Sequence, residues 1–245
     1  MNTDKNITSS WKRNTIFFIT SQTLSMFGTM IVQYAIMWHL VLKTQSASMM
    51  TLYIVAGVLP TFFTSLFGGV WADRYNKKHM INIADGSIGL ISLIIAISLF
   101  AEYDSIGLLL LAAAVRALGQ GVQQPAVNSL VPLIVPENKL LRVNGLNGSI
   151  QSGIFLLSPI VSASLMALVP LGMLFLIDVV TAAFAVGILY LFVKVPHTEN
   201  KPESEKQASH MEELVNGLKY IRTQKYLLLL IVFSTVYMIA MTPVS

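Results

Sequence analysis

The sequence predicts an all-α membrane protein with seven transmembrane helices, the last of which follows a long polar linker. Two observations lead to this fold class. Hydrophobic residues make up 54% of the 245-residue chain and charged residues only 11%, whereas soluble domains carry about 25% charged residues. The apolar residues are also gathered into long runs, each close to the roughly 20 residues that a helix needs to cross a bilayer.

The predicted spans follow one another through short turns, except before the last one. Residues 132–142 are expected to connect the fourth and fifth spans, and 197–209 to form a flexible linker. Within 211–221 the apolar residues recur at helical spacing, which predicts an amphipathic helix on the membrane surface. The predicted spans are residues 14–42, 50–72, 80–101, 106–127, 145–169, 171–193 and 226–245.

The distribution of cations predicts the orientation of the chain. Fourteen of its 16 Lys and Arg residues fall in the amino-terminal leader or in the loops on the same side of the predicted bundle. Lys43 lies on the other side, and Arg116 lies inside a span. Because Lys and Arg accumulate in cytoplasmic loops, we expect the amino terminus and the long linker in the cytoplasm.

Other features of the composition exclude whole classes of function. The chain has no cysteine, so disulfides and thiolate metal sites are excluded. It contains no phosphate-binding glycine loop and no paired carboxylates or nucleophilic triad at a common depth, so we expect no enzyme and no cofactor. The cations do not form one soluble face, which argues against nucleic acid. No metal-ligand spacing relates His39, His79, His197 and His210.

A charged turn separates the second and third spans, and such a turn must lie at a membrane surface. The stretch resembles the loop between helices 2 and 3 of the major facilitator superfamily, written G-x-x-x-D-R-x-G-R-R. Asn76 stands where the family has Gly, and we expect it to tolerate a positive φ there. The resemblance implies that Asp73 is a gate residue; alternatively, Asp73 only caps the third helix. The matching residues are Gly69, Asp73, Arg74, Lys77 and Lys78.

Arg116 is the one basic residue well inside a predicted span, and such residues usually face a cavity or a partner. Its surroundings resemble the helix 4 motif R-x-x-Q-G-x-G of proton-coupled drug exporters, with Gly119 and Gln120 in swapped order. The continuation through Pro125-Ala126 resembles the macrolide-efflux branch. The resemblance implies a role for Arg116 in proton coupling or gating. The alternative is a structural Arg that holds helices together.

Two carboxylates are further candidates for proton coupling, because an intramembrane carboxylate usually has a function. Asp178 lies in the sixth span, near its outer end, and is the stronger candidate for the proton site. The alternative is that both carboxylates lie close enough to a membrane interface to stay hydrated and ionised. Asp85 lies near the cytoplasmic start of the third span. For Asp85 we expect instead an ion pair with Arg74, Lys77 or Lys78.

Polar side chains recur at helical spacing in the first, fourth and fifth spans and predict one shared cavity. The alternative is hydrogen bonding between helices. The fifth span resembles the exporter motif G-x-x-x-G-P-x-x-G-G, with Ser158-Pro159 in place of Gly-Pro. Methionine and aromatic residues of the first span are candidates for a greasy drug pocket, although ordinary lipid or helix contacts are the favoured interpretation for most of them. These residues are Met26, Phe27, Met30, Tyr34, Met37 and Trp38. The predicted cavity residues are Gln22, Ser25, Thr29, Gln33, Gln120, Gln124, Asn147, Gln151 and Ser158.

The resemblance implies a major facilitator six-helix N-terminal bundle plus a seventh transmembrane helix, and with it proton-coupled efflux of amphipathic, macrolide-like drugs by alternating access. Alternatives are an importer of another solute, or a non-transporting sensor, regulator or decayed fragment. We expect that a single copy cannot transport without the C-terminal half or a second chain, truncation being the favoured explanation. The expected domains are a leader at 1–13, the bundle at 14–193, a linker at 194–225 and the start of a second bundle at 226–245.

The predicted orientation can be tested with single cysteines, because the chain has none of its own. A cysteine at Glu203 should be protected from impermeant thiol reagents in intact cells, and one at Tyr103 should react. The reverse labelling pattern would overturn the predicted topology.

Overall fold

In the computed structural model, residues 3–195 and 223–241 are described, and every regular element in these two ranges is an α-helix. The chain divides into two units, residues 1–197 and 198–245. The second unit contributes α8, Lys225–Met241. The first unit contributes α1 (Thr3–Thr44), α2 (Ala47–Arg74), α3 (Lys77–Phe100), α4 (Ile106–Ile134), α5 (Glu137–Leu168) and α6 (Leu171–Phe192).

Six of the described helices, α1 to α6, are long and apolar enough to cross a membrane. The predicted all-α membrane fold is therefore confirmed. The apolar α8 coincides with the seventh predicted span. The predicted linker at 197–209 and the amphipathic helix at 211–221 lie outside the described residues.

The connection expected at 132–142 is wrong in its length. α4 continues through Pro132 to Ile134, and α5 begins at Glu137, so the turn comprises two residues. Pro132 stays inside the helix because proline in a membrane helix is tolerated where neighbouring groups satisfy the freed carbonyl. Pro136 is the N-cap residue that precedes α5, and it has no backbone N–H that would need a partner there. The first helix likewise begins earlier than predicted, at Thr3.

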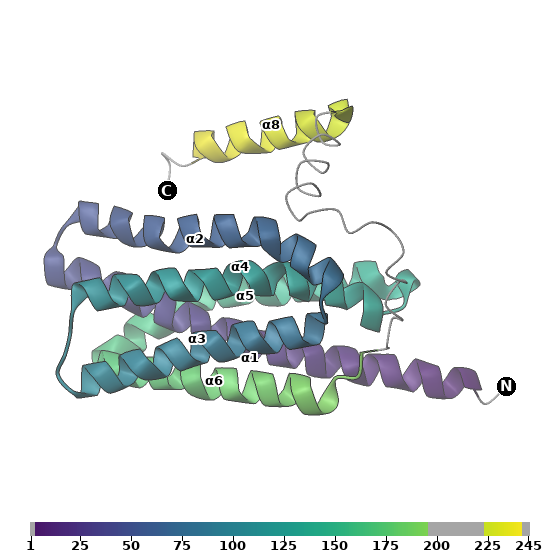
Figure 1. Cartoon of the computed structure of the whole chain (residues 1–245), viewed down its shortest axis with the longest axis horizontal. Coiled ribbons are helices and arrows are strands. Elements are labelled where there is room, and N and C mark those ends of the chain that lie inside the picture. The colour runs from purple at the N-terminus through teal and green to yellow at the C-terminus, as the bar shows by residue number, and fades with distance from the viewer. Residues whose placement is uncertain (1–2, 196–222, 242–245) are drawn as a thin grey trace. The chain divides into compact units, whose positions relative to one another are not determined.

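The six helices of the first unit form one bundle (Figure 1). α4 packs mainly against α2 and α3, α6 packs against α1 and α3, and α5 packs against α1. Membrane helices lack a hydrophobic driving force for association, so small residues that allow close backbone approach are important. Gly28 in α1 faces Thr181 and Asp178 of α6, and Gly121 in α4 faces Thr64 of α2.

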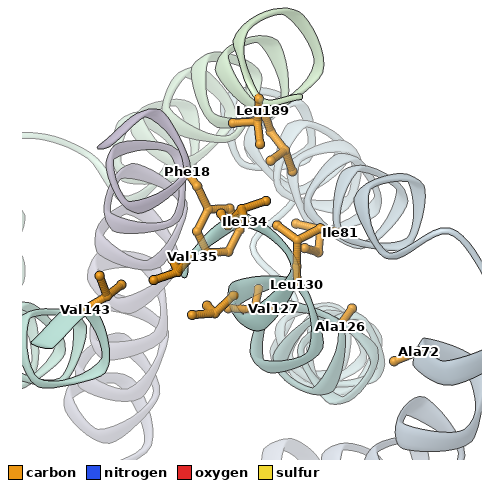
Figure 2. Packing of buried hydrophobic residues seen from close by; sticks show 12 residues of the cluster. Phe18, Ala72, Ile81, Ala126, Val127, Leu130, Ile134, Val135, Val143 and Leu189 are labelled. Atoms are coloured by element: carbon orange, nitrogen blue, oxygen red, sulfur yellow. The ribbon is translucent and has the colours of Figure 1, made fainter. Parts of the chain in front are cut away.

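Two apolar clusters fill the two ends of this bundle. Figure 2 shows the first, in which Phe18, Ile81 and Leu130 meet between α1, α3 and α4, with Leu189 of α6 above them. The second cluster lies at the other end of these helices and includes Ile36, Ile95, Leu109 and Phe175. The stretch of helix between the two clusters carries the buried polar groups described below.

The turn between α2 and α3 corrects the expectation for Asn76. Its φ is −66°, and among the described residues only Gln45 and Glu102 have a positive φ. The Asn76 side chain instead accepts hydrogen bonds from the backbone N–H groups of Lys78 and His79, at 3.1 and 3.3 Å. Asn76, and not Asp73, is therefore the N-cap of α3.

The close approach of α2 and α4 predicts the effect of one substitution. A Cβ at Gly121 would lie 2.8 Å from the Thr61 carbonyl oxygen and would also meet the Thr64 hydroxyl. Gly121→Ala should therefore lower the free energy of unfolding by about 1–3 kcal/mol, as other overpacked sites do. Unfolding in mixed detergent micelles measures this.

Gly187→Ala is the matched control, because no atom lies within 4 Å of a Cβ built at that helical position. It should be neutral or stabilising by up to about 1 kcal/mol. Equal stability of the two variants would contradict the packing argument.

Candidate functional site

A buried ion pair lies at the centre of the first unit. Arg116 of α4 is 3% exposed and Asp178 of α6 is 1% exposed, and Arg116 Nη1 lies 2.5 Å from Asp178 Oδ2. Ser92 of α3 joins both: its hydroxyl accepts from Arg116 Nη1 and lies 2.6 Å from Asp178 Oδ2. Thr29 of α1 donates to Asp178 Oδ1 at 3.3 Å, and its carbonyl accepts from Arg116 Nη2 at 3.4 Å. One charge pair thus connects four helices.

The position of this pair follows from the order of residues along each helix. In α4, Arg116 lies between Ala113 of one apolar cluster and Ala126 of the other, and in α6, Asp178 lies between Phe175 and Leu189. Both charges therefore occupy the middle layer of the bundle. Ions buried at such a depth are normally paired and functional.

Gly28 allows this arrangement, since a larger residue there would collide with the site. A Cβ at Gly28 would lie 3.1 Å from Asp178 Oδ1 and would overlap the Thr181 hydroxyl. The absence of a side chain at this point lets α1 and α6 approach closely. Thr29, the next residue, can then reach the Asp178 carboxylate.

Asp85 forms a second buried polar group, in α3. It is 1% exposed. Its Oδ1 accepts hydrogen bonds from Ser25 Oγ of α1 and Gln123 Nε2 of α4, both at 2.5 Å, and its Oδ2 has no hydrogen-bond partner among the described residues. The expected ion pair with the loop cations is therefore wrong. The reason is depth: Asp85 lies two turns inside α3, facing α1 and α4.

Lys78, one of the cations expected to pair with Asp85, has a different role. Its Nζ donates to the carbonyl oxygens of Tyr190 and Val193, at 2.9 and 2.7 Å, and so caps the carboxyl end of α6. A cation at a helix carboxyl end also interacts favourably with the helix dipole. Asn14 of α1 assists, because its Nδ2 donates to the Lys194 carbonyl at 2.8 Å. The start of α3 is thereby held to the end of α6.

The remaining residues of the predicted gating motif lie on the surface of the same end. Asp73 and Arg74 are exposed in the last turn of α2, and Lys77 is half-buried at the start of α3. Gly69 faces open space, since no atom lies within 4 Å of a Cβ built there. A carboxylate at a helix carboxyl end is unfavourable with respect to the helix dipole. Asp73 is therefore not expected to stabilise α2 through the helix dipole.

The opposite end of the bundle is held by a partly exposed cluster. Lys43 Nζ at the end of α1 lies 2.6 Å from Asp104 Oδ2, before α4, and His39 Nε2 lies 3.1 Å from the same oxygen. Partial burial raises the pKa of Asp104, but the hydrogen bond from Lys43 and the charges of His39 and Lys43 outweigh burial. The net pKa is below its ordinary value.

A cavity of about 460 Å³ opens between α1, α2 and α4, with Phe155 of α5 at its edge. Two of the predicted cavity residues, Gln33 and Gln120, line it. Arg116, which was predicted as a coupling residue, lines it too. Of the six first-span candidates, Met30, Tyr34 and Met37 are also in its wall, whereas Met26, Phe27 and Trp38 do not line it. The α2 contribution, Tyr53, Ile54, Gly57, Val58, Thr61 and Phe62, was not predicted from the sequence.

The other predicted cavity residues lie elsewhere. Ser25 and Thr29 bind the two carboxylates. Ser158 is buried, and Ser162, one turn further along α5, donates to the Ile31 carbonyl of α1 at 2.9 Å. This part of the α5 stripe thus packs on α1. The half-buried residues Gln22, Asn147 and Gln151 and the exposed Gln124 do not line this cavity.

Sequence reasoning missed two residues of the site, Ser92 and Gln123, although helical spacing contained a signal for both. Ser92 follows Asp85 by seven residues and Gln123 follows Arg116 by seven, which places each on the same helix face as the charge. Among the described residues, no group of three or more His, Asp or Glu could hold a metal ion.

The fold, the charged α2–α3 turn and the buried charges define a multi-pass membrane protein of a transporter superfamily. The family model of the Major Facilitator Superfamily matches residues 18–245, and the chain belongs to that family.

Its curated relatives include macrolide efflux proteins. Macrolide efflux protein A of Streptococcus pyogenes is 28% identical over 240 residues, 97% of this chain and 58% of that protein. The protein of the same name in Enterococcus faecalis is 29% identical over 177 residues, 72% of this chain and 54% of the relative. An uncharacterized MFS-type transporter of Bacillus subtilis, YvqJ, is 23% identical over 222 residues. The chain thus spans little more than half the length of the curated relatives it matches.

The buried pair predicts a strongly non-additive pair of substitutions. Arg116→Leu and Asp178→Leu should each lower the free energy of unfolding by about 3–5 kcal/mol, because each leaves one buried charge unpaired. The double variant should lose much less than the sum, since no unpaired charge remains. Unfolding in mixed micelles gives the three values.

The partly exposed pair Lys43–Asp104 is the matched control. The same double-mutant cycle there should yield a coupling below about 1 kcal/mol. Similar coupling energies in the two cycles would show that burial does not govern the Arg116–Asp178 pair.

Proposed function

We propose that this chain forms the amino-terminal bundle of a proton-coupled exporter of amphipathic, macrolide-like drugs that works by alternating access. It would lie in the plasma membrane with its amino terminus in the cytoplasm. Two macrolide efflux proteins among its relatives support the substrate class. The 14 cations on one predicted side support the orientation.

The observation that carries this proposal is the place of Arg116. Its guanidinium forms the buried pair with Asp178, and the same residue lines the cavity. A molecule in the cavity would therefore contact one member of the charge pair directly. Substrate binding and the electrostatics of the bundle centre would be coupled through this residue, as exchange of a drug for a proton requires.

The chemistry of the cavity supports an amphipathic substrate. Its wall is mostly apolar, with aromatic rings from Tyr34, Tyr53, Phe62 and Phe155. Ligand sites of this kind combine an apolar lining with a few polar groups that fix orientation. Gln33 and Gln120 supply such groups. Flexible methionines, here Met30 and Met37, adapt to ligands of different shape.

The charged turn supports the alternating-access part of the proposal. Asp73 is exposed and lies where a carboxylate does not stabilise its own helix. Contacts made in one conformation of a transport cycle would account for a carboxylate in that place. Gly69, Arg74, Lys77 and Lys78 would complete this gate, with Lys78 anchoring it to α6.

The proposal includes a second helical bundle, from the same or another polypeptide, facing the cavity. The relatives are longer, with 52–58% of their length covered by this chain. In this superfamily the substrate lies between two six-helix halves. This chain together with its second bundle forms the assembled transporter.

The experiment is export of a macrolide from lipid vesicles by the assembled transporter, driven by an imposed pH gradient. Arg116→Ala and Asp178→Asn should each impair export per amount of folded protein, and Arg116→Ala should do so more severely because it also changes the cavity wall. Export independent of the pH gradient would refute proton coupling.

Glu102→Gln is the control, because Glu102 is exposed in the turn after α3 and outside the buried cluster. It should export as the wild type does. Wild-type behaviour of both Arg116→Ala and Asp178→Asn would refute the role of the buried pair.

A further inference from the structure

We propose that Asp85, and not Asp178, holds the proton that this bundle exchanges, while the Arg116–Asp178 pair stays fixed in its charge. This inference rests on the proposed proton coupling and assigns the proton to one of the three buried groups. Sequence reasoning favoured the opposite assignment, with Asp178 as the proton site.

The hydrogen-bond partners of the two carboxylates carry the argument. Both oxygens of Asp178 are occupied: Oδ1 accepts from Thr29, and Oδ2 meets Ser92 and the Arg116 guanidinium. Arginine keeps its charge at any accessible pH. A proton on Asp178 would therefore leave a buried guanidinium without its counter-charge, at a cost of several kcal/mol.

Asp85 differs from Asp178 in its counter-charge and in the hydrogen bonding of its oxygens. In the part of the chain that the structure describes, no Lys, Arg or His forms an ion pair with it, and its Oδ2 is buried without a hydrogen-bond partner. An ionised Asp85 would place an unpaired charge in the protein interior within a membrane span. Such a charge is expensive, and protonation removes it. The free Oδ2 is the position for the proton.

The charged groups on neighbouring helices do not supply a counter-charge. α6 presents Asp178, a second carboxylate, and α4 presents Arg116, which is already bound to Asp178. α1 presents the uncharged Ser25. On α3 itself, Lys78 donates to the α6 carbonyls.

Two features make the proton exchangeable. Asp85 lies eight residues beyond Lys77, the first residue of α3, or about 12 Å along the helix at 1.5 Å per residue. Opening of this end would admit water, which would take the proton from Oδ2 and leave a carboxylate. Ser25 and Gln123 already donate to Oδ1 and would stabilise that charge.

Gln123 also gives a physical path for coupling. It lies on α4, two turns from Arg116, which lines the cavity. A shift of α4 on substrate binding would move the Gln123 amide relative to Asp85. This movement would change the free energy that is needed to ionise Asp85. The proton and the substrate would then affect each other through one rigid helix.

The first experiment is infrared difference spectroscopy of the full chain in lipid vesicles during a pH change. The wild type should show the carbonyl stretch of a neutral carboxylic acid, lost reversibly as pH rises. Asp85→Asn should lack this band, because an amide is not a carboxylic acid. Its amide oxygen can still accept hydrogen bonds from Ser25 and Gln123, so the change is conservative. Asp178→Asn and Glu102→Gln should retain it. A band that persists in Asp85→Asn, is absent from the wild type, or is lost only in Asp178→Asn would overturn the proposal.

Asp85→Glu covers the case in which Asp85→Asn fails to fold. It keeps a carboxylic acid in a shifted environment, so the band should remain at a changed frequency. An unchanged frequency would exclude Asp85 as the source. Loss of the wild-type band on adding sodium ions at constant pH would indicate a sodium site and would overturn the proton assignment.

The second experiment separates this inference from the proposed function. In the assembled transporter, Asp85→Asn should reduce pH-driven macrolide export roughly tenfold or more, within the usual range of coupling between two sites. Full pH-driven export by Asp85→Asn would refute the inference and leave the exporter proposal intact. No pH-driven export by the wild type, together with a band assigned to Asp85, would refute the exporter proposal and leave the proton site intact.

Discussion

The ion pair between Arg116 and Asp178 is the interaction on which the rest of the bundle depends. Two opposite charges in the middle layer of a membrane protein are tolerated only if each satisfies the other. This requirement fixes the relative position of α4 and α6 and, through Ser92 and Thr29, that of α3 and α1. Apolar side chains in lipid could slide past one another at little cost, whereas these charges allow one register.

Close backbone approach is the condition that lets the charges meet. Gly28 leaves room for Asp178 and Thr181, and Gly121 leaves room for the threonines of α2. Side-chain hydrogen bonds then lock the ends of the bundle. Lys78 and Asn14 satisfy carbonyls at the end of α6, and Lys43 and Asp104 connect α1 to the start of α4. The first of these contacts gives a residue of the charged turn a structural role in addition to any role in gating.

The two buried carboxylates illustrate how environment separates groups of identical chemistry. Asp178 has three hydrogen-bond donors, one of which is the cation Arg116, whereas Asp85 has two donors on a single oxygen and no cation. The same side chain can therefore serve as a fixed charge in one place and as a candidate proton carrier a few turns away. Arg116 of the fixed pair lies in the wall of the cavity, whereas Asp178 and Asp85 do not line it.

The sequence by itself determined the fold class and the position of the helices, because about 20 apolar residues in succession can only be a membrane span. It also identified Arg116, Asp178 and Asp85, since ionisable residues stand out in apolar runs. Only the tertiary structure decided their partners. Ser92 and Gln123 became relevant because α3 packs against α4. Ser158 is buried outside the cavity, and Ser162, one turn further along α5, donates to a carbonyl of α1. Helical periodicity gives the face of each residue, but the helix opposite that face is set by packing between distant segments.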